Sequence, residues 1–292
     1  MRLSWFLALA LAAASPALAA DPAPDKAAAN PQGSADFNAL IDQLTADPAL
    51  DKAVADPQRS AEFRARDGAR HPATELKFFG IKPKDTVVEI WPSGGYWTEI
   101  LGPYLHDGGK LYTAGPPADT GREGTDKARA TFQQKLDADP ARYGKVIVTQ
   151  FGKDHYDIAP PGSADLVVTF RNLHNWMPGG YADAAMAAFF KALKPGGVLG
   201  IEDHRAPTTS PQDPKADNGY VREDYAIELA EKAGFVYVRG SEINANPKDT
   251  KDWPKGVWTL PPTYALGDQD RAKYAAIGEA DNFVLKFRKP AK

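Results

Sequence analysis

The sequence contains no cysteine. This absence excludes disulfide bonds, thiolate nucleophiles, iron–sulfur clusters and zinc sites built on cysteine. Neither sign of charge dominates, because 35 lysines and arginines stand against 38 aspartates and glutamates, for a formal net charge of −3. We therefore expect neither a nucleic-acid partner nor a surface that lies on anionic lipid. The 43% of hydrophobic and 25% of charged residues are typical of a packed globular protein.

The strongest apolar run lies at the N-terminus. Arg2 precedes a run from Trp5 to Ala14, and Ala17-Leu18-Ala19 follows it. This order is typical of a cleaved secretory signal peptide, here residues 1–20, and predicts a periplasmic or secreted protein. The alternative is an uncleaved membrane anchor, but Ser15-Pro16 interrupts the run before the roughly 20 residues that span a bilayer. After signal cleavage we expect no contact with the membrane.

Two short regions precede the main domain. Residues 21–33 are rich in alanine, proline and aspartate, which predicts a disordered leader. Residues 34–82 are predicted to form an N-terminal helical cap. Asp47-Pro48 and Asp56-Pro57 divide this cap into short helices, since the residue before a proline is disfavoured in the α conformation. Its first helix is indicated by the helical spacing of Phe37, Leu40, Ile41 and Leu44.

From residue 83 to 292, short β-branched runs alternate with helical segments. This alternation predicts βαβ units, and so an α/β fold with a doubly wound, Rossmann-like, seven-stranded and mostly parallel sheet, plus the N-terminal helices. No helix is evident between the last two strands, so the last strand should be antiparallel. Residues 242–280 are too long for a hairpin loop and are interpreted as a folded insertion over a cleft. The predicted strands are 86–90, 110–114, 146–151, 165–170, 197–202, 235–239 and 283–287, and the helices between them are 96–105, 125–136, 181–193 and 222–233.

In such a sheet, ligands bind beyond the carboxyl ends of the strands. The first strand runs into a glycine-rich turn that ends at Gly94 and Gly95, where the backbone can approach a ligand closely. The turn lacks the G-x-G-x-x-G pattern, so a nicotinamide oxidoreductase is poorly supported. The alternative interpretation is a tight turn that needs glycine for its geometry alone.

Polar residues also follow the fourth and fifth strands. Arg171, Asn172 and His174 come after the fourth, while Asp203 and His204 come after the fifth. Polar groups at the end of a buried strand need partners, and so predict the lining of a cleft. A neutral imidazole serves as a general base or as a metal ligand. We predict His174 as the catalytic base and His204 as the second choice; no metal is predicted, although the two histidines with Asp203 form a weak candidate site.

Three segments resemble class I S-adenosylmethionine-dependent methyltransferases, and more closely a family of exported bacterial predicted methyltransferases. They are residues 85–100, 165–176 and 193–203, the last beginning Leu-Lys-Pro-Gly-Gly. The resemblance extends from about residue 59 to residue 287 and implies S-adenosylmethionine as cofactor, with its methionine part held by the turn after the first strand. The cofactor-binding residues implied are Glu89, Trp91, Ser93, Gly94, Gly95, Asp154, Arg171 and Asn172.

The sequence departs from the family pattern at two places. The pattern acid-x-Gly-x-Gly-x-Gly has Trp91 and Ser93 in place of its first two glycines. The second strand lacks the acid that binds the ribose hydroxyls, and the next acid is Asp119. An unpaired ribose diol weakens binding by about 1–3 kcal/mol.

The function expected from these features is transfer of a methyl group from S-adenosylmethionine to a small-molecule acceptor by an exported enzyme. Arg70 and Asp67 could close over the site, or could form a solvated charged face. The alternative function is a catalytically inactive methyltransferase-fold module that binds an exported small molecule, and the replaced glycines and missing acid favour it.

Overall fold

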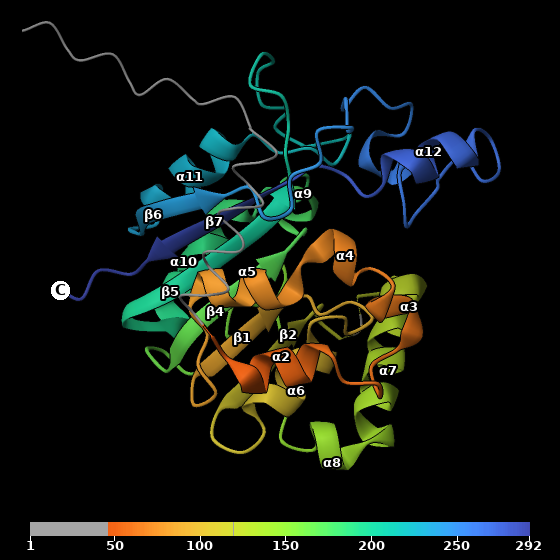
Figure 1. Ribbon diagram of the computed structural model, residues 1–292. Helices are drawn as coiled ribbons and strands as arrows, with labels where there is room; N and C mark the ends of the chain where they lie inside the picture. Colours follow the sequence, from red (N-terminus) through yellow and green to blue (C-terminus); the bar gives the residue numbers. More distant parts are fainter. Residues whose placement is uncertain (1–45, 119) are drawn as a thin grey trace, which may run out of the picture.

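The computed structural model describes residues 46–118 and 120–292 (Figure 1). The predicted signal peptide (1–20), the leader (21–33) and the first helix of the cap, which contains Phe37, lie outside these ranges and stay predictions. Asp119 also lies outside them. Within the described ranges, no helix is both long and apolar enough to cross a membrane.

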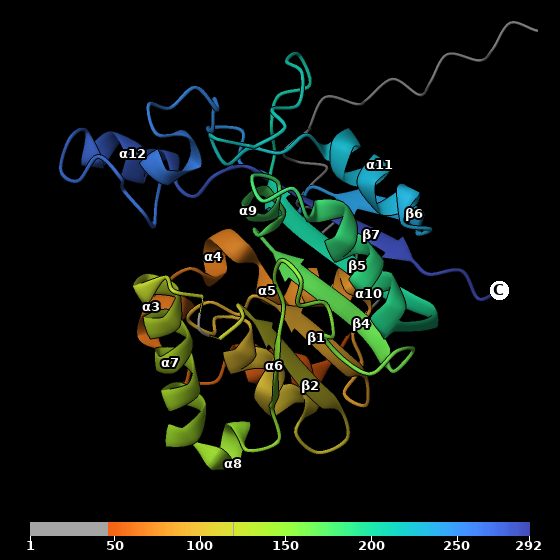
Figure 2. The same ribbon diagram turned by 180° about the vertical axis from the view of Figure 1, so that it is seen from behind.

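A seven-stranded sheet forms the centre of the molecule, in the order β3-β2-β1-β4-β5-β7-β6 (Figures 1 and 2). Neighbours from β3 to β5 pair in parallel, and β7 pairs antiparallel with both β5 and β6. This topology confirms the predicted fold class, including the antiparallel last strand. The strands are β1 (Thr86–Ile90), β2 (Lys110–Gly115), β3 (Ile147–Gln150), β4 (Ala164–Phe170), β5 (Leu193–His204), β6 (Val236–Ser241) and β7 (Asn282–Arg288).

The central strands form where the sequence is continuously apolar or β-branched. In β1 and β4 nearly every side chain is buried, because both faces of the sheet are covered. Strand β5 is longer than the predicted 197–202: it starts at Leu193, which pairs with Ala164 before a register shift, and it ends at His204. Asp203 and His204 therefore lie in the strand itself, where the register of the sheet fixes their backbone.

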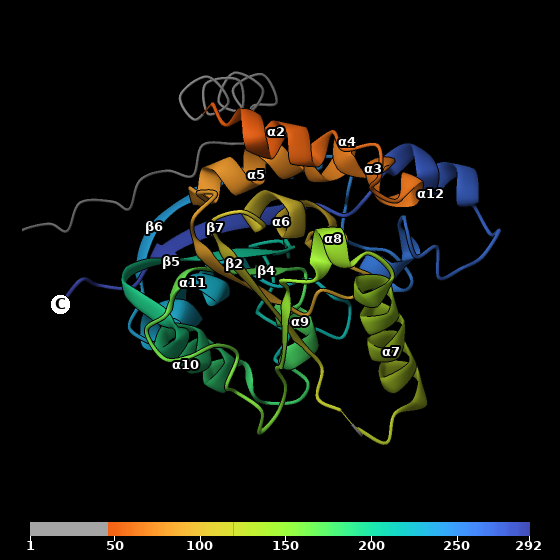
Figure 3. The same ribbon diagram turned by 90° about the horizontal axis from the view of Figure 1, so that it is seen from below.

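Helices cover both faces of the sheet (Figure 3). On one face lie α2 (Pro48–Val54), α5 (Pro72–Phe79) and α6 (Thr98–Leu105); on the other lie α10 (Ala182–Ala192) and α11 (Glu223–Lys232). A separate apolar core fills the space on each side. The helices of the N-terminal region thus belong to one of the two helical layers.

Several short helices complete the structure. As predicted, Asp56-Pro57 separates α2 from α3, whereas the predicted break at Asp47-Pro48 borders residues outside the described ranges and stays a prediction. Asp47 caps α2 by accepting hydrogen bonds from the backbone N–H groups of Ala49 and Leu50. The sequence did not predict α12, a seven-residue helix between β6 and β7, because only one of its side chains, Tyr274, is buried and no apolar periodicity marks it. The remaining helices are α3 (Ala61–Arg64), α4 (Asp67–Arg70), α7 (Glu123–Ala138), α8 (Pro140–Tyr143), α9 (Leu173–Trp176), the 3-10 helix η1 (Gly256–Thr259) and α12 (Arg271–Ile277).

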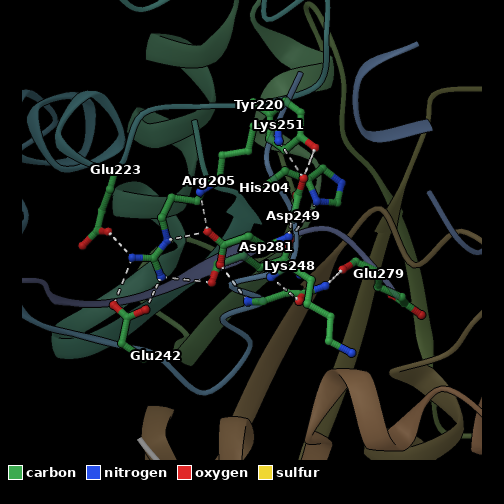
Figure 4. Close-up of polar contacts among 12 residues, drawn as sticks. His204, Arg205, Tyr220, Glu223, Glu242, Lys248, Asp249, Lys251, Glu279 and Asp281 are labelled. Atoms are coloured by element: carbon green, nitrogen blue, oxygen red, sulfur yellow. Dashed lines mark hydrogen bonds and ion pairs between the residues drawn. The ribbon is translucent and has the colours of Figure 1, made fainter. Parts of the chain in front are cut away.

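Polar contacts attach residues 242–281 to the chain that follows β5 (Figure 4). The hydroxyl of Tyr220 donates to both oxygens of Asp249, at 2.9 and 3.0 Å. Arg205, just beyond β5, forms ion pairs with Glu242 and Asp281. These contacts fix both ends of the segment, and a small apolar cluster around Val257 and Leu260 fills its middle.

Gly200→Ala is expected to destabilise the protein by about 1–3 kcal/mol through overpacking. A methyl group at Gly200 would lie 2.7–2.8 Å from three carbons of the buried Phe79 ring. Thermal unfolding followed by circular dichroism should therefore give a Tm below that of the wild type. Gly115→Ala is the matched control, since at this second strand glycine no heavy atom lies within 4 Å of the added carbon. Equal Tm values for the two variants would contradict the packing of α5 on β5.

Candidate active site

Two cavities flank the turn after β1. The larger, of about 1070 Å³, lies between this turn, the end of β2 and α7. The smaller, of about 340 Å³, lies at the carboxyl ends of β1, β4 and β5, and residues of the 242–280 segment form part of its wall. Phe63 and residues 91–94 line both cavities. The turn therefore forms part of the wall of both cavities.

Two residues of the turn other than glycine adopt a backbone conformation that glycine adopts more easily. Trp91 and Ser93 have φ values of 50° and 52°, in the left-handed region that disfavours side chains. The Trp91 indole N–H donates to the Phe151 carbonyl at 2.8 Å, and its ring packs edge-on against Trp176. Such strain persists only where the surroundings impose it, and it is concentrated at functional sites.

Glu89, the acidic residue of β1, is buried and lines the smaller cavity. Its side chain is 1% exposed, and burial raises its pKa from 4.5 to about 7 although Thr98 donates to its Oε2 at 2.7 Å. Its Oε1 is buried and accepts no hydrogen bond. A buried carboxyl with one free oxygen beside a cavity is suited to bind a cationic amine.

Asn172 and Arg171 follow β4 and line the smaller cavity. The Asn172 amide donates to the Ile90 carbonyl at 3.0 Å and so links the ends of β1 and β4. Arg171 has a φ of 60°, and its Nη1 donates to Glu279 at 2.6 Å. Its Nη2 is buried and has no hydrogen-bond partner.

His174 and Asp203 form a buried pair at the same cavity. His174 Nδ1 lies 2.8 Å from Asp203 Oδ1, and because a carboxylate only accepts, this nitrogen carries the proton. Burial alone would raise the pKa of Asp203, but the charge and hydrogen bond of His174 lower it, so the carboxylate stays ionised. His174 Nε2 is thereby left as the nitrogen that can accept a proton.

His204 lies beside His174, with 5.2 Å between the ring centroids. Its Nδ1 is 2.7 Å from the Asn282 side-chain oxygen. Burial, together with repulsion from His174, lowers the pKa of His204 to about 3, so this ring is neutral at ordinary pH. A neutral ring with so low a pKa is a weaker base than an imidazole paired with a carboxylate.

Among the described residues, His174, Asp203 and His204 form one group whose ligand atoms lie within 4.8 Å of one another. Both oxygens of Asp203 already accept hydrogen bonds: Oδ1 from His174 Nδ1 and the His204 amide, and Oδ2 from the His174 amide. This pattern favours a carboxylate that orients His174 over one that binds a metal ion.

The structure does not bring every predicted residue to the cavities. Asp154 is exposed in the turn after β3 and lines neither cavity. Gly95 has a φ of 91° and lies behind the turn, where an added Cβ would be 3.2 Å from Phe132. Asp67 lines neither cavity and accepts hydrogen bonds from Arg59 and Tyr96, whereas Arg70 does line the smaller one.

Three residues of the site were not predicted from the sequence. Arg66 and Trp258 line the smaller cavity, and the Trp258 ring packs edge-on 6.0 Å from that of His174. Glu279 binds Arg66 although 213 residues separate them. The only sequence signal was the length and tryptophan content of residues 242–280, which predicted a cover over a cleft without naming its contacts.

Solved structures with the same fold include several S-adenosylmethionine-dependent methyltransferases. A SAM-dependent methyltransferase from Aquifex aeolicus is 15% identical, with 86% of this chain and 98% of that one covered, at a TM-score of 0.53. A candidate sarcosine dimethylglycine methyltransferase from Galdieria sulphuraria is 13% identical, with coverages of 88% and 98%, also at 0.53. The cyclase SpnF is 14% identical, with coverages of 89% and 97% and the same TM-score.

These likenesses show the fold of S-adenosylmethionine-dependent methyltransferases. Because a cyclase shares it, the fold does not fix the reaction, and the chemistry has to be argued from the site. No protein-family model matches the chain, and no curated protein matches it in sequence.

Glu89→Gln is expected to stabilise the protein more at pH 8 than at pH 5. The pKa of Glu89 is about 7 in the folded protein against 4.5 for the free side chain, so folding becomes less favourable as the pH rises from 4.5 to 7. Glutamine removes this loss of unfolding free energy, which is at most about 3 kcal/mol. Denaturant unfolding of both proteins at pH 5 and pH 8 measures the difference in their free energies of unfolding.

Glu123→Gln, in the exposed first turn of α7, is the matched control for the same substitution at the surface. A Glu89→Gln effect that is the same at pH 5 and pH 8 would show that the Glu89 carboxyl has an ordinary pKa.

Proposed function

We propose that this protein transfers a methyl group from S-adenosylmethionine to a small-molecule acceptor. The observation that carries the proposal is that His174, held by Asp203, lines the same cavity as Glu89 and the turn after β1. A base and a cofactor-holding loop at one cavity are what methyl transfer from a sulfonium requires. The shared fold with methyltransferases supports the same conclusion.

The residues of the turn fit the cofactor. Glu89 Oε1, buried and without a partner, is the group we assign to the ammonium of its methionine part. The left-handed backbone at Trp91 and Ser93 preserves the loop shape in spite of the replaced glycines. When bound, S-adenosylmethionine supplies a reactive methyl group on its sulfonium.

The larger cavity is suited to the adenosine part. Thr113, in β2, lines it and has a buried hydroxyl without a hydrogen-bond partner. We assign this hydroxyl to the ribose, in place of the missing acid. A neutral hydroxyl binds a diol more weakly than a carboxylate does, so the affinity for the cofactor should be modest.

The chain's own contribution to the reaction is alignment and proton removal. Asp203 holds the Nδ1–H of His174, which orients the ring and favours the protonated imidazole after transfer. His204 stays neutral and lies against His174 as part of the cavity wall.

A catalytically inactive binding module is the second candidate. The indole of Trp91 at a glycine position favours it, because this side chain lines both cavities and takes up space at the turn. Turnover by the wild type decides between the two functions.

We further propose that the protein is exported, from the signal-peptide pattern of residues 1–20. Intact-mass measurement of the protein recovered from the periplasm or medium should show loss of 19 or 20 residues. Recovery of the full-length chain from the cytoplasm alone would contradict export.

The full chain is expected to bind S-adenosylmethionine and S-adenosylhomocysteine with micromolar dissociation constants, measured by calorimetry. Gly95→Val should abolish this binding, because valine disfavours a φ of 91° and its Cβ would press on Phe132. Gly68→Ala, with no heavy atom within 4 Å of the added carbon, is the control. Absence of binding by a folded wild type would contradict the proposed function.

His174→Gln is expected to lower turnover by about 10²–10⁴-fold and to leave cofactor binding nearly unchanged. Turnover is measured as release of S-adenosylhomocysteine with a panel of small phenols, thiols and carboxylic acids. His204→Gln is the matched comparison and should have a smaller effect, since its pKa is already about 3. If both variants turn over like the wild type, His174 is not the base.

A further inference from the structure

Three guanidinium groups meet at one carboxylate beside the smaller cavity. Arg66 donates to both oxygens of Glu279, at 2.6 and 2.8 Å. Arg171 Nη1 donates to the same side chain at 2.6 Å, and Arg70 Nε lies 3.6 Å from it. The three arginines come from two segments, Arg66 and Arg70 from the two ends of α4 and Arg171 from just after β4, and all three line the cavity.

Two N–H donors of this arginine cluster (Arg66, Arg70 and Arg171) have no hydrogen-bond acceptor among the described residues. Arg70 Nε and Arg171 Nη2 are buried and donate no hydrogen bond to any described residue. The side chains of Arg70 and Arg171 are only 10% and 9% exposed. Arg70 Nε has only the longer ion pair to Glu279, at 3.6 Å, and the Arg70 guanidinium lies 4.4 Å from the centroid of the Tyr96 ring. A buried charged donor without a hydrogen bond is costly, and a group bound in the cavity would supply the acceptor.

The charges around the cluster do not balance. Arg66 and Arg171 lower the pKa of Glu279 against the effect of burial, so one negative charge faces three positive ones. Glu202 lies 3.9 Å from Arg171, but burial raises its pKa to about 7. Of the other acids, Glu89 also has a pKa of about 7 and Asp203 is engaged by His174. Glu279 is therefore the one fully ionised carboxylate that the three arginines share, while ionised Asp203 and the partly ionised Glu89 and Glu202 lower the net charge of the cavity as a whole.

We propose that the methyl acceptor is an anion, and that its carboxylate or phosphate group binds to Arg70 and Arg171 with Glu279 as their internal counter-ion. This inference rests on the proposed function and names the class of its substrate. Arginine forks match the planar oxygens of a carboxylate and the oxygens of a phosphate, which supports either group.

The charge of the cofactor favours the acceptor as the source of this anion. S-adenosylmethionine has a sulfonium and an ammonium against a single carboxylate, so it brings one net positive charge to a cavity that three arginines line. An anionic acceptor lowers this repulsion. Arg171 is three residues before His174 on one segment, so an anion held there places the rest of the acceptor beside the base.

The carboxylate of the cofactor is the other possible source, and calorimetry separates the two. The full chain is saturated with S-adenosylhomocysteine and then titrated with malonate, inorganic phosphate or the neutral analogue malonamide. Binding of either anion to the saturated protein, without binding of malonamide, supports the proposal. Binding of the anions only when S-adenosylhomocysteine is absent would overturn it, because the arginines would then serve the cofactor.

Two variants should change the affinity for the anion in opposite directions. Arg70→Gln should weaken anion binding by about tenfold, through loss of a charged donor. Glu279→Gln should strengthen it, because the internal counter-ion is removed. Arg288→Gln is the control, since Arg288 is exposed at the end of β7, at the opposite edge of the sheet. If Arg70→Gln fails to fold, as judged by its Tm, the gain in Glu279→Gln remains the test.

The outcomes for the cofactor and for the anion are distinguishable. Failure of S-adenosylhomocysteine to bind would contradict the proposed function, and the anions are then titrated into the free protein. There, binding that weakens in Arg70→Gln and strengthens in Glu279→Gln still supports an anionic ligand. Anion affinities that are the same in wild type, Arg70→Gln and Glu279→Gln would overturn the inference.

Discussion

A charged group buried at the end of a strand must find a partner or lose its charge, and this constraint organises the carboxyl edge of the sheet. Asp203 keeps its charge because His174 and two backbone amides bind it. Glu89 has one hydroxyl partner, and burial raises its pKa to about 7. Arg171 is held by Glu279. Each pairing fixes a side chain at the cavity, so the electrostatics of burial also position the site.

Side-chain contacts, rather than glycine, hold the backbone conformation of the turn after β1. Trp91 and Ser93 adopt the left-handed conformation that glycine adopts easily, and contacts of the indole with Phe151 and Trp176 hold it there. The strained loop still stands between two cavities. A strained conformation is easier to understand for a loop that binds a ligand than for a turn that only reverses the chain, and both candidate functions include such a ligand.

The segment between β6 and β7 does more than connect two strands. Its polar anchors at Asp249 and Asp281 attach it to Tyr220 and Arg205, in the chain that follows β5 (Figure 4). Glu279 then reaches the arginine cluster, and Trp258 packs on His174. One wall of the smaller cavity is thus made by residues that lack the regular periodicity of the domain. Specificity for an acceptor is expected to depend on this segment more than on the sheet.

The sheet could be predicted from the sequence: the β-branched runs at 86–90 and 165–170 are typical of central parallel strands, so the polar residues after them were expected to meet at one edge. The same reasoning placed His174 and His204 at that edge. Which side chains pair became evident only in the folded structure. Glu279 meets Arg66 across 213 residues, and Asp154 stays exposed outside the site. Strand formation follows from local burial, whereas ion pairing follows from distances that exist only once the chain has closed on itself.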